Sequence, residues 1–464
     1  MKKLKYIAIS AAALVGLGFS SCNSSDAYFE SDAQNTQIKV SKVYLEDYKS
    51  SVPDREVDFA RLGQLIRIEG EGLYGVKKVI INGYDTYFNR ALVSDRSMLV
   101  TVNSKTPISE CDPELRDKVT LKKDGSEFTF DLVIRAASPT VTGISNSLPQ
   151  PGEKVIVYGT GFQETSLVTL PGGVKVTEGI ESDNEEGEWF SFTMPQGVTE
   201  GGSIEAVNAN GVAKTPAYFN ERSGMVLDCD GTGVFGKWSA TYDYETDLAD
   251  DPANSGRGKV IPVVPLSIVQ GDGVKAGGQS SAWFTAGNDE PSDDWARMYK
   301  LIPEMTPVSE IAFQFDIYCP EPLSTGVLEF TFQNNLSNYG FGTSETTADY
   351  SGAYAVCWVP WINEEGEFEP FRTDDWVTVT IPVNTVGKYQ DASVDNVFKN
   401  VVEDRNAASY RNFGLFFVNK DVEYTDGNTY PATQFNQGVF VDNWRIVPYK
   451  SFTVSDFPDE EEAE

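Results

Sequence analysis

The sequence contains no histidine among its 464 residues. This absence excludes a Ser-His-Asp or Cys-His catalytic group, a histidine general base, and zinc or iron held by imidazole. Carboxylate chemistry is the main enzymatic option left, and a glycosidase needs two carboxyl groups roughly 5–10 Å apart, one of them with a raised pKa. Acidic residues are so abundant here that chance pairs are inevitable. Their abundance is therefore no evidence for hydrolysis.

Cysteine is scarce, with five residues and no C-x-x-C pair. Cys111 is alone in its predicted domain, so an immunoglobulin-type disulfide cannot form there. Cys229, Cys319 and Cys357 lie further along the chain. For these three, both a bridge and buried free thiols remain open.

Positive charge is also limited, because 37 Lys and Arg stand against 69 Asp and Glu, for a net charge of −32. Nucleic acids and anionic polymers need Lys and Arg to neutralise them, so a neutral partner is predicted and nucleic acid is not. Residues 451–464 are predicted to be an acidic tail. The stretch Thr241–Pro252 could offer Asp oxygens to calcium, but it lacks EF-hand spacing and is better interpreted as a charged surface loop. No metal and no cofactor are predicted.

Only one apolar run is long, and it is close to the N-terminus. Lys2, Lys3 and Lys5 precede the apolar residues 6–19, and Ser20-Ser21 lead into Cys22. This pattern predicts a secretory signal over residues 1–21, since the run is too short to span a membrane. The residues before Cys22 resemble a bacterial lipobox, which implies that Cys22 is lipidated. Residues 22–37 are predicted to be a flexible tether.

An internal repeat organises the front half of the chain. LIRIEGEGLYGVKKVIINGY, from Leu65, aligns without gaps to KVIVYGTGFQETSLVTLPGG, from Lys154. Both copies contain a strand, then Gly-x-Gly, then a large apolar residue. A period near 90 residues matches one small β-sandwich, so the predicted domains are residues 38–137 and 138–221. The pattern resembles the IPT/TIG immunoglobulin-like domain, whose members usually act as spacers.

From residue 222 the composition changes, and most of the tryptophans follow. Short alternating segments such as IAFQFDIY, GVLEFTFQ, WVTVTIPV and GVFVDNWRIVP predict many strands without helical crossovers. The predicted fold class is all-β, with two Ig-like (IPT/TIG) β-sandwiches followed by a larger jelly-roll-like β-sandwich over residues 222–450.

Two tryptophans in AYAVCWVPWINEEGEFEPF are the leading candidates for a binding site. Trp358 falls in a predicted strand, and Pro360 should end that strand because proline cannot donate to a ladder. Trp361 is therefore expected at a strand end, with its ring exposed. An exposed indole can stack on a sugar ring while its N–H remains free to hydrogen-bond.

Further candidates could complete an aromatic platform. Tyr354 shares a face with Trp358 if the alternation is regular. Trp376 and Trp444 lie in regular apolar alternations and are predicted to be core. The other candidates flank or lie in polar loops, where amides can both donate to and accept from hydroxyls; they are Trp283, Trp295, Asn334, Asn335 and Tyr339.

The segments DCDGTGVFGKW, FDIYCPEPLSTGVLEFTF, WVPWINEEGEFEPFRTDDWVTVTIPV and VFVDNWRIVP are similar to the C-terminal domain of the Bacteroidetes surface glycan-binding protein B family. The type member of that family binds xyloglucan. By position, the family's W-x-P-W aromatics match Trp358 and Trp361. The family pattern carries a tryptophan before Ser-Thr-Gly where this chain has Leu323, which implies that one stacking ring is missing or displaced.

The resemblance implies a non-catalytic lipoprotein on the outer-membrane surface that captures a neutral polysaccharide of the β-glucan or xyloglucan class. Its implied partners are a TonB-dependent transporter and a SusD-like protein. Two alternatives stay open from the sequence: a surface adhesin whose Ig-like domains meet another protein, and a carboxylate-based glycoside hydrolase.

Overall fold

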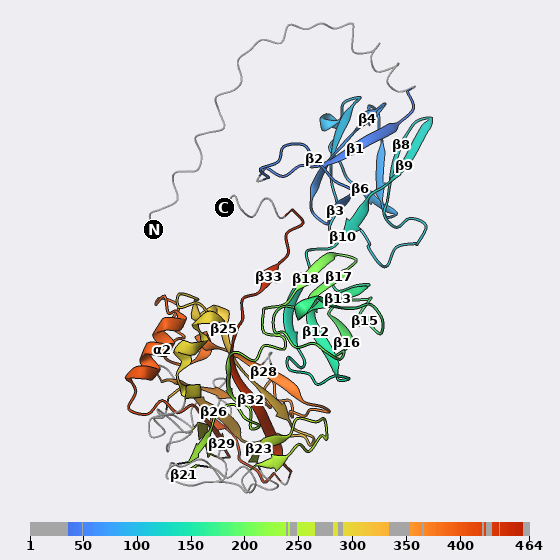
Figure 1. Ribbon diagram of the computed structural model, residues 1–464. Helices are drawn as coiled ribbons and strands as arrows, with labels where there is room; N and C mark the ends of the chain where they lie inside the picture. Colours follow the sequence, from blue (N-terminus) through green and yellow to red (C-terminus); the bar gives the residue numbers. More distant parts are fainter. Residues whose placement is uncertain are drawn as a thin grey trace. The chain divides into compact units, whose positions relative to one another are not determined.

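The structure is a computed structural model in which residues 36–48, 50–237, 240–241, 248–264, 282–285, 291–333, 353–363, 366–419, 422–423, 429–435 and 437–457 are described. The chain divides into two compact units with the boundary between Ala137 and Ser138 (Figure 1). Each unit is described by itself. Within the described residues, no helix is both long and apolar enough to cross a membrane. The predicted signal, Cys22 and most of the tether lie outside the described residues.

Unit 1 is an immunoglobulin-like sandwich of short, mainly antiparallel strands. One sheet has the order β2 (Arg55–Glu56), β1 (Lys39–Leu45), β4 (Leu65–Glu71), β7 (Ser97–Thr101). The other has the order β6 (Tyr84–Thr86), β5 (Lys78–Ile81), β8 (Lys118–Lys123), β9 (Ser126–Asp131). A parallel pair, β3 (Phe59–Arg61) and β10 (Val133–Arg135), and the 3-10 turn η1 (Arg90–Leu92) complete the unit.

Alternation along the strands of unit 1 separates its core from its charged exterior. Ile66 and Ile68 of β4 are fully buried, as are Val79 and Ile81 of β5. The outer faces carry ion pairs between neighbouring strands, among them Lys42–Glu56, Lys78–Asp85, Lys118–Asp131 and Lys122–Glu127. The exterior of these sheets is therefore a solvated, charge-paired surface.

Unit 2 begins with a second immunoglobulin-like sandwich. One sheet has the order β11 (Thr140–Ile144), β12 (Lys154–Thr160), β16 (Trp189–Thr193), β15 (Glu181–Ser182). The other has the order β14 (Val174–Val176), β13 (Leu167–Leu170), β17 (Glu205–Asn208), β18 (Gly211–Lys214), β33 (Phe452–Thr453), and the 3-10 turn η2 (Pro171–Gly173) follows β13.

The structure explains the Gly-x-Gly of the repeat. A Cβ on Gly70 would lie 1.9 Å from the carbonyl oxygen of Lys39, and one on Gly159 would lie 1.9 Å from that of Thr140. In both sandwiches the partner strand carries a bulge near this glycine, so only glycine admits the close approach. The second glycine of each pair has a positive φ, 69° at Gly72 and 80° at Gly161.

The rest of unit 2 is the larger sandwich, built from two antiparallel sheets (Figure 1). The first sheet has the order β22 (Ala249–Asp250), β23 (Lys259–Val264), β32 (Val439–Pro448), β25 (Ile311–Tyr318), β28 (Val377–Pro382), with β19 (Met225–Leu227) also paired to β32. The second has the order β21 (Ala240–Thr241), β20 (Phe235–Lys237), β24 (Ala282–Thr285), β29 (Gly414–Val418), β26 (Val327–Thr331), β27 (Ala355–Trp358). β30 (Val422–Glu423) and β31 (Thr429–Tyr430) form a separate hairpin.

Aromatic rings join the two sheets across one core. Phe313 and Phe315 of β25 lie with ring centroids 5.0 and 4.7 Å from that of Phe330 of β26. Trp444 is fully buried there, as predicted, and Trp376 is buried in a small cluster beside β23. The predicted all-β class is confirmed, with two Ig-like sandwiches and a larger one.

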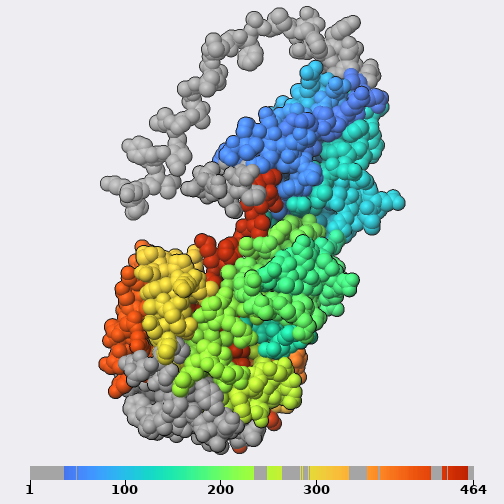
Figure 2. All heavy atoms as spheres, viewed as in Figure 1, coloured from blue at the N-terminus to red at the C-terminus, as the bar shows by residue number. Residues whose placement is uncertain are grey.

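Among the described residues, one α-helix interrupts this β architecture, although the sequence shows little helical periodicity. α2 (Phe398–Ala407) buries Phe398, Val401, Val402 and Arg405 against the core. The remaining 3-10 turns of this part are η3 (Pro291–Asp293), η4 (Trp295–Lys300), η5 (Val308–Glu310) and η6 (Val383–Thr385). Figure 2 shows the segment near residue 300, in yellow, against that near residue 400, in orange, where the Lys399 amide donates to the Glu304 carbonyl at 2.9 Å.

The second Ig-like sandwich is fixed to the larger one by buried polar groups. The loop of residues 145–150 lies on the outer face of the first sheet, where Ser147 Oγ contacts Thr378 Oγ1 at 3.0 Å. Arg257, 5% exposed, donates to Asp316 at 2.6 Å and to Asn146 at 3.3 Å. Arg445 donates to Gln314 at 2.7 Å and also to Ser147. These two sandwiches therefore belong to one compact unit.

The end of the chain departs from the prediction of an acidic tail over residues 451–464. Phe452 and Thr453 form β33, which pairs with Lys214 and Ala213 of β18, as Figure 1 shows. Just before it, the ring of Tyr449 stacks on buried Tyr218 at 6.3 Å. The prediction was wrong for residues 452–453. They pair with the edge strand β18, and aromatic side chains that precede the acidic residues pack against the second Ig-like sandwich.

The described cysteines are all free. Cys229 and Cys319 are buried, whereas Cys111 and Cys357 are partly exposed. The sequence left open either a disulfide or buried free thiols, and Cys229 and Cys319 are buried free thiols. Burial raises the pKa of the Cys319 thiol to about 12, which keeps it protonated and unreactive.

Candidate functional site

The predicted site residues separate into three groups in the structure. Asn334, Asn335 and Tyr339 lie outside the described residues. Trp283, Trp295 and Trp361 are buried, and Tyr354 and Trp358 are partly exposed. The predicted platform of exposed tryptophans is therefore replaced by a smaller surface centred on β27.

Trp283 and Trp295 are core residues, which corrects the prediction that their rings take part in glycan binding. Trp283, on β24, points into the core between the two sheets and is 3% exposed. Trp295, at the start of η4, is 1% exposed and packs with its ring 5.5 Å from that of Phe332. The guanidinium of Arg405 lies 3.8 Å from the Trp295 ring. A buried cation above an indole closes the site that a sugar would need.

Trp361 is also buried, at 1% exposed, so the prediction of a bare ring there was wrong. Pro360 does follow the end of β27 at Trp358, as predicted. The chain then turns back as a hairpin, with a bridge between Ile362 and Phe368, and the Trp361 ring packs under Phe368. Its Nε1 donates to the Gly326 carbonyl at 2.6 Å. The indole N–H, which was expected to hydrogen-bond to a glycan, is therefore already used within the protein.

Trp358 lies at the edge of the second sheet and keeps part of its ring exposed. It pairs with Leu328 of β26, so its ring faces the rim of the core. Phe315 and Phe371 hold the ring edge-on, with centroids 5.6 and 5.3 Å away and interplanar angles of 75° and 83°. An indole packed against two other rings is fixed in place, so it has little side-chain entropy left to lose on binding.

Two phenylalanines near Trp358 were missed by the sequence reasoning. Phe368 is 51% exposed on the hairpin, and Phe371 is partly exposed beside Trp358. Phe371 is held by a pair of hydrogen bonds to Leu323, 2.8 and 2.9 Å long. Local alternation gave no signal for Phe368, because Glu367 and Glu369 flank it and neighbouring side chains on a strand face opposite sides.

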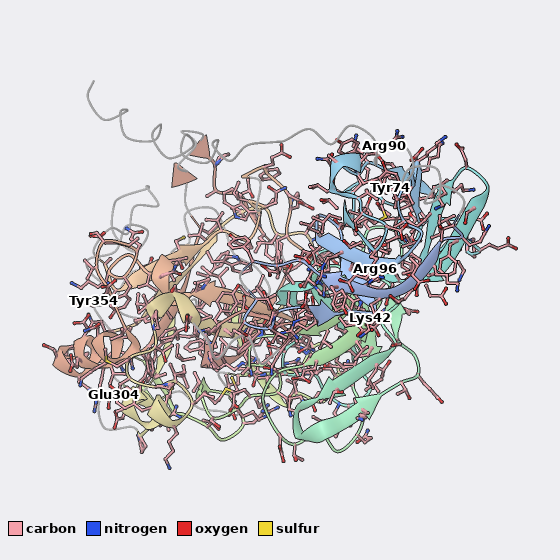
Figure 3. All side chains as sticks on the ribbon, turned by 90° about the horizontal axis from the view of Figure 1, so that it is seen from above. Lys42, Tyr74, Arg90, Arg96, Glu304 and Tyr354 are labelled. Carbon is pink, nitrogen blue, oxygen red and sulfur yellow. The ribbon has the colours of Figure 1, made fainter. Side chains whose placement is uncertain are left out.

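Tyr354 precedes β27 at the other end of the same strand. Its ring lies edge-on to Tyr389, with centroids 6.2 Å apart, and the Lys388 ammonium is 5.9 Å above it. Figure 3 labels Tyr354 at the α2 end of the domain, where Glu304 also lies. We call Tyr354, Trp358, Phe368 and Phe371 the aromatic edge.

The family model described as "surface glycan-binding protein B xyloglucan binding domain" matches residues 219–448, which contain the whole aromatic edge. Residues 219–448 therefore form a domain of the surface glycan-binding protein B family. The matched range begins beside β19 and ends with β32, so it covers the larger sandwich.

Two relatives bear on the family assignment. The crystal structure of surface glycan-binding protein PbSGBP-B from Prevotella bryantii is similar over 90% of this chain and 100% of its own, with a TM-score of 0.62 and 16% identity, which shows the shared fold. An IPT/TIG domain-containing protein of Bacteroides ovatus is 30% identical over 109 residues, or 23% of this chain. That match spans 22% of the length of the Bacteroides ovatus protein.

Two buried carboxylates, those of Asp316 and Asp442, lie away from the aromatic edge. Asp316 and Asp442 are neighbours on the outer face of the first sheet, whereas Phe315, which contacts Trp358, is on its inner face. Asp316 accepts hydrogen bonds from Arg257, Thr378 and Asn443. Burial raises the pKa of Asp442 well above its usual value, but this acid lies beside Cys229 and not beside the aromatic rings.

The acidic stretch Thr241–Pro252 is described only in part. Asp251, its buried carboxylate, accepts hydrogen bonds from Ser255 Oγ at 2.9 Å and from Trp376 Nε1 at 3.0 Å. The amides of Ala253 and Ser255 also donate to it. Protein donors thus already use the Asp251 oxygens, which agrees with a structural loop.

Proposed function

We propose that this protein is a non-catalytic, lipid-anchored surface protein that captures a neutral polysaccharide of the β-glucan or xyloglucan class. In this proposal it holds the glycan at the outer membrane for a TonB-dependent transporter and its SusD-like partner. The observation that carries the proposal is the family match over residues 219–448, together with the partly exposed rings of the aromatic edge inside that range.

The chemistry of the aromatic edge suits a sugar chain. Pyranose rings present C–H faces that stack on aromatic rings, and Phe368 and Trp358 offer such surfaces. Asn363, whose side chain contacts Glu369 at 3.3 Å, lies on the same hairpin, so an amide and carboxylates are near for hydroxyl groups.

The charge of this part of the chain favours a neutral ligand. Residues 138–450 contain 44 Asp and Glu against 18 Lys and Arg. An acidic or sulfated glycan would be repelled by such a surface. A neutral glucan carries no such penalty, and its hydroxyl groups can accept from amides and donate to carboxylates.

Two parts of the proposal, surface anchoring and a non-catalytic role, are supported by different observations. The signal over residues 1–21 and the lipobox-like approach to Cys22 support export and lipidation. The positions of Asp316 and Asp442, on the sheet face covered by residues 145–150, support a non-catalytic role. Capture by several weak sites repeated on a membrane would raise the effective affinity for a long polymer.

Affinity electrophoresis of the mature protein against a polysaccharide panel tests the proposal. Xyloglucan or a β-glucan should retard migration, whereas polyanionic glycans should not. Phe368→Ala and Trp358→Ala should each weaken binding about tenfold, because each removes a stacking surface. Tyr87→Ala, which changes an 81% exposed ring of unit 1, is the control and should bind normally. No retardation by any glycan would favour an adhesin, and release of reducing ends would favour a hydrolase.

A further inference from the structure

Three segments meet at the Tyr354 end of β27 and place polar groups together. Gln333 follows β26, Tyr354 precedes β27, and Lys388 lies in the turn after η6. Backbone hydrogen bonds fix their positions: the Phe332 amide donates to the Tyr354 carbonyl at 2.8 Å, and the Lys388 amide donates to the Ala353 carbonyl at 2.7 Å. The groups are therefore held by the sheet and not by a loose loop.

Within the described part of the chain, one acceptor of this cluster has no hydrogen-bond partner. Gln333 is 8% exposed, and its side chain lies close enough to the Tyr354 phenol to influence the pKa of that phenol. Its carbonyl oxygen Oε1 is buried and has no hydrogen-bond partner among the residues that the structure describes. Buried polar atoms are nearly always paired, so an unpaired one in a native structure calls for an explanation such as a ligand.

The ring of Tyr354 is held in place from below. Tyr389 is 2% exposed, packs edge-on against Tyr354, and donates its hydroxyl to Asp404 Oδ2 of α2 at 3.1 Å. Burial raises the pKa of Tyr354, and so does the charge of Asp404, so the phenol stays protonated and able to donate. The Lys388 ammonium, 5.9 Å above the ring, adds a second donor on the exposed side.

We infer that Gln333, Tyr354 and Lys388 form a second contact point for the glycan, which recognises sugar hydroxyl groups and not a sugar face. This inference rests on the proposed function. One sugar hydroxyl can donate to Gln333 Oε1, the acceptor that the described residues leave unpaired. The same hydroxyl, or the next one on the sugar ring, can accept a hydrogen bond from Tyr354 or Lys388.

The position of this contact point sets the length of ligand that it can serve. Tyr354 and Trp358 are four residues apart along extended chain, which is about 13 Å. A glycan stacked on Trp358 reaches Gln333 only if it extends along β27. Short oligosaccharides should therefore use the Trp358 end alone, and longer ones should use both ends.

Isothermal titration with β-glucan and xyloglucan oligosaccharides graded in length tests the inference. Tyr354→Phe and Gln333→Met keep the shape of each side chain but remove its hydrogen-bonding groups. Each should weaken the longest oligosaccharides about fivefold, the effect of one hydrogen bond, and leave the shortest that binds unchanged. Lys399→Met, which removes an exposed cation paired with Glu304, is the control and should change neither.

The outcomes separate the inference from the proposed function. If the unaltered protein binds glycans and the two variants bind long and short ones as it does, the second contact point is wrong and the proposed function stands. Equal weakening at every length would also overturn it, since the cluster would then act on the Trp358 end. If the unaltered protein binds no glycan of any length, the proposed function fails and the inference fails with it.

Discussion

The two immunoglobulin-like sandwiches have the same internal design but different attachments. Each has the Gly-x-Gly approach to a bulged partner strand, and the residues of β4 and β12 that face the core correspond one to one. The first forms a unit of its own, whereas the second shares a unit with the larger sandwich. A repeated local pattern therefore encodes the fold of each copy but does not determine whether the copy is an independent spacer.

A few buried polar side chains make the difference. Ser147, Gln314, Asp316 and Arg445 are each 1% exposed or less, and they join the loop of residues 145–150 to the first sheet of the larger sandwich. Core clusters also merge, because Ala312 and Val447 of the larger sandwich pack in the core of the second Ig-like one. We therefore interpret the second copy as part of the binding unit and the first as the spacer.

Removing the guanidinium of Arg257 should give the largest difference in stability between the two units. Arg257→Met leaves Asp316 buried without its ion-pair partner, so unit 2 should lose about 3 kcal/mol of unfolding free energy. Unit 1 should unfold as before. Calorimetry or denaturant unfolding resolves the two transitions. The matched change in unit 1 is Arg67→Met, which breaks a more exposed ion-pair network and should cost about 1 kcal/mol or less in unit 1 alone.

Substitutions of Gly70 and Gly159 compare the stability of the same two units, with a smaller expected effect. Gly70→Ala and Gly159→Ala each force a Cβ against a carbonyl oxygen, and each should cost its own unit about 2 kcal/mol. Gly70→Ala should leave glycan binding intact, whereas Gly159→Ala should lower the melting temperature of the entire binding unit. Gly143→Ala is the control, since no heavy atom lies within 4 Å of its Cβ. If Gly159→Ala melts only residues 138–220, unit 2 is not cooperative.

Truncation after Lys450 should have a smaller effect. It removes β33, which adds an edge strand to β18 and places Phe452 5.4 Å from the Lys214 ammonium. Two strand pairs at an edge contribute about 1 kcal/mol, so unit 2 should melt slightly lower while unit 1 stays unchanged. A truncated protein as stable as the full chain would show that the terminal segment is only a tail.

Salt should distinguish the two regions by the smallest margin. Residues 38–137 contain sixteen acidic and sixteen basic residues, whereas residues 138–450 contain 44 and 18. Added salt screens repulsion in the second region and weakens favourable ion pairs in the first. The melting temperature of unit 2 should therefore rise with salt, and that of unit 1 should stay level or fall. The same trend in both units would mean that net charge does not matter here.

Periodicity and turn chemistry predicted much of this fold from the sequence. The repeat correctly paired Ile66 and Ile68 with Val155 and Val157, because strand alternation is a local property. The aromatic-rich segments were correctly assigned to strands for the same reason. The docking of residues 145–150 could not be predicted, since it joins residues far apart in sequence, as with Ser147 and Arg445.

The exposure of single rings was the hardest part to predict. Trp361 looked exposed after Pro360, yet the hairpin folds back and the Gly326 carbonyl, distant in sequence, takes its N–H. Trp295 was a candidate for binding because it lies beside a polar loop, yet Arg405 from α2 covers its ring. Local pattern locates a tryptophan at a strand end, but its partners come from elsewhere in the chain and decide whether it is buried.

The most direct test is a crystal structure of the mature protein with a xyloglucan or β-glucan oligosaccharide. We predict that the sugar rings lie against Phe368, Trp358 and Phe371 and extend along β27 toward Tyr354. Sugar bound on unit 1, or on any face of unit 2 that leaves these rings uncovered, would contradict the account.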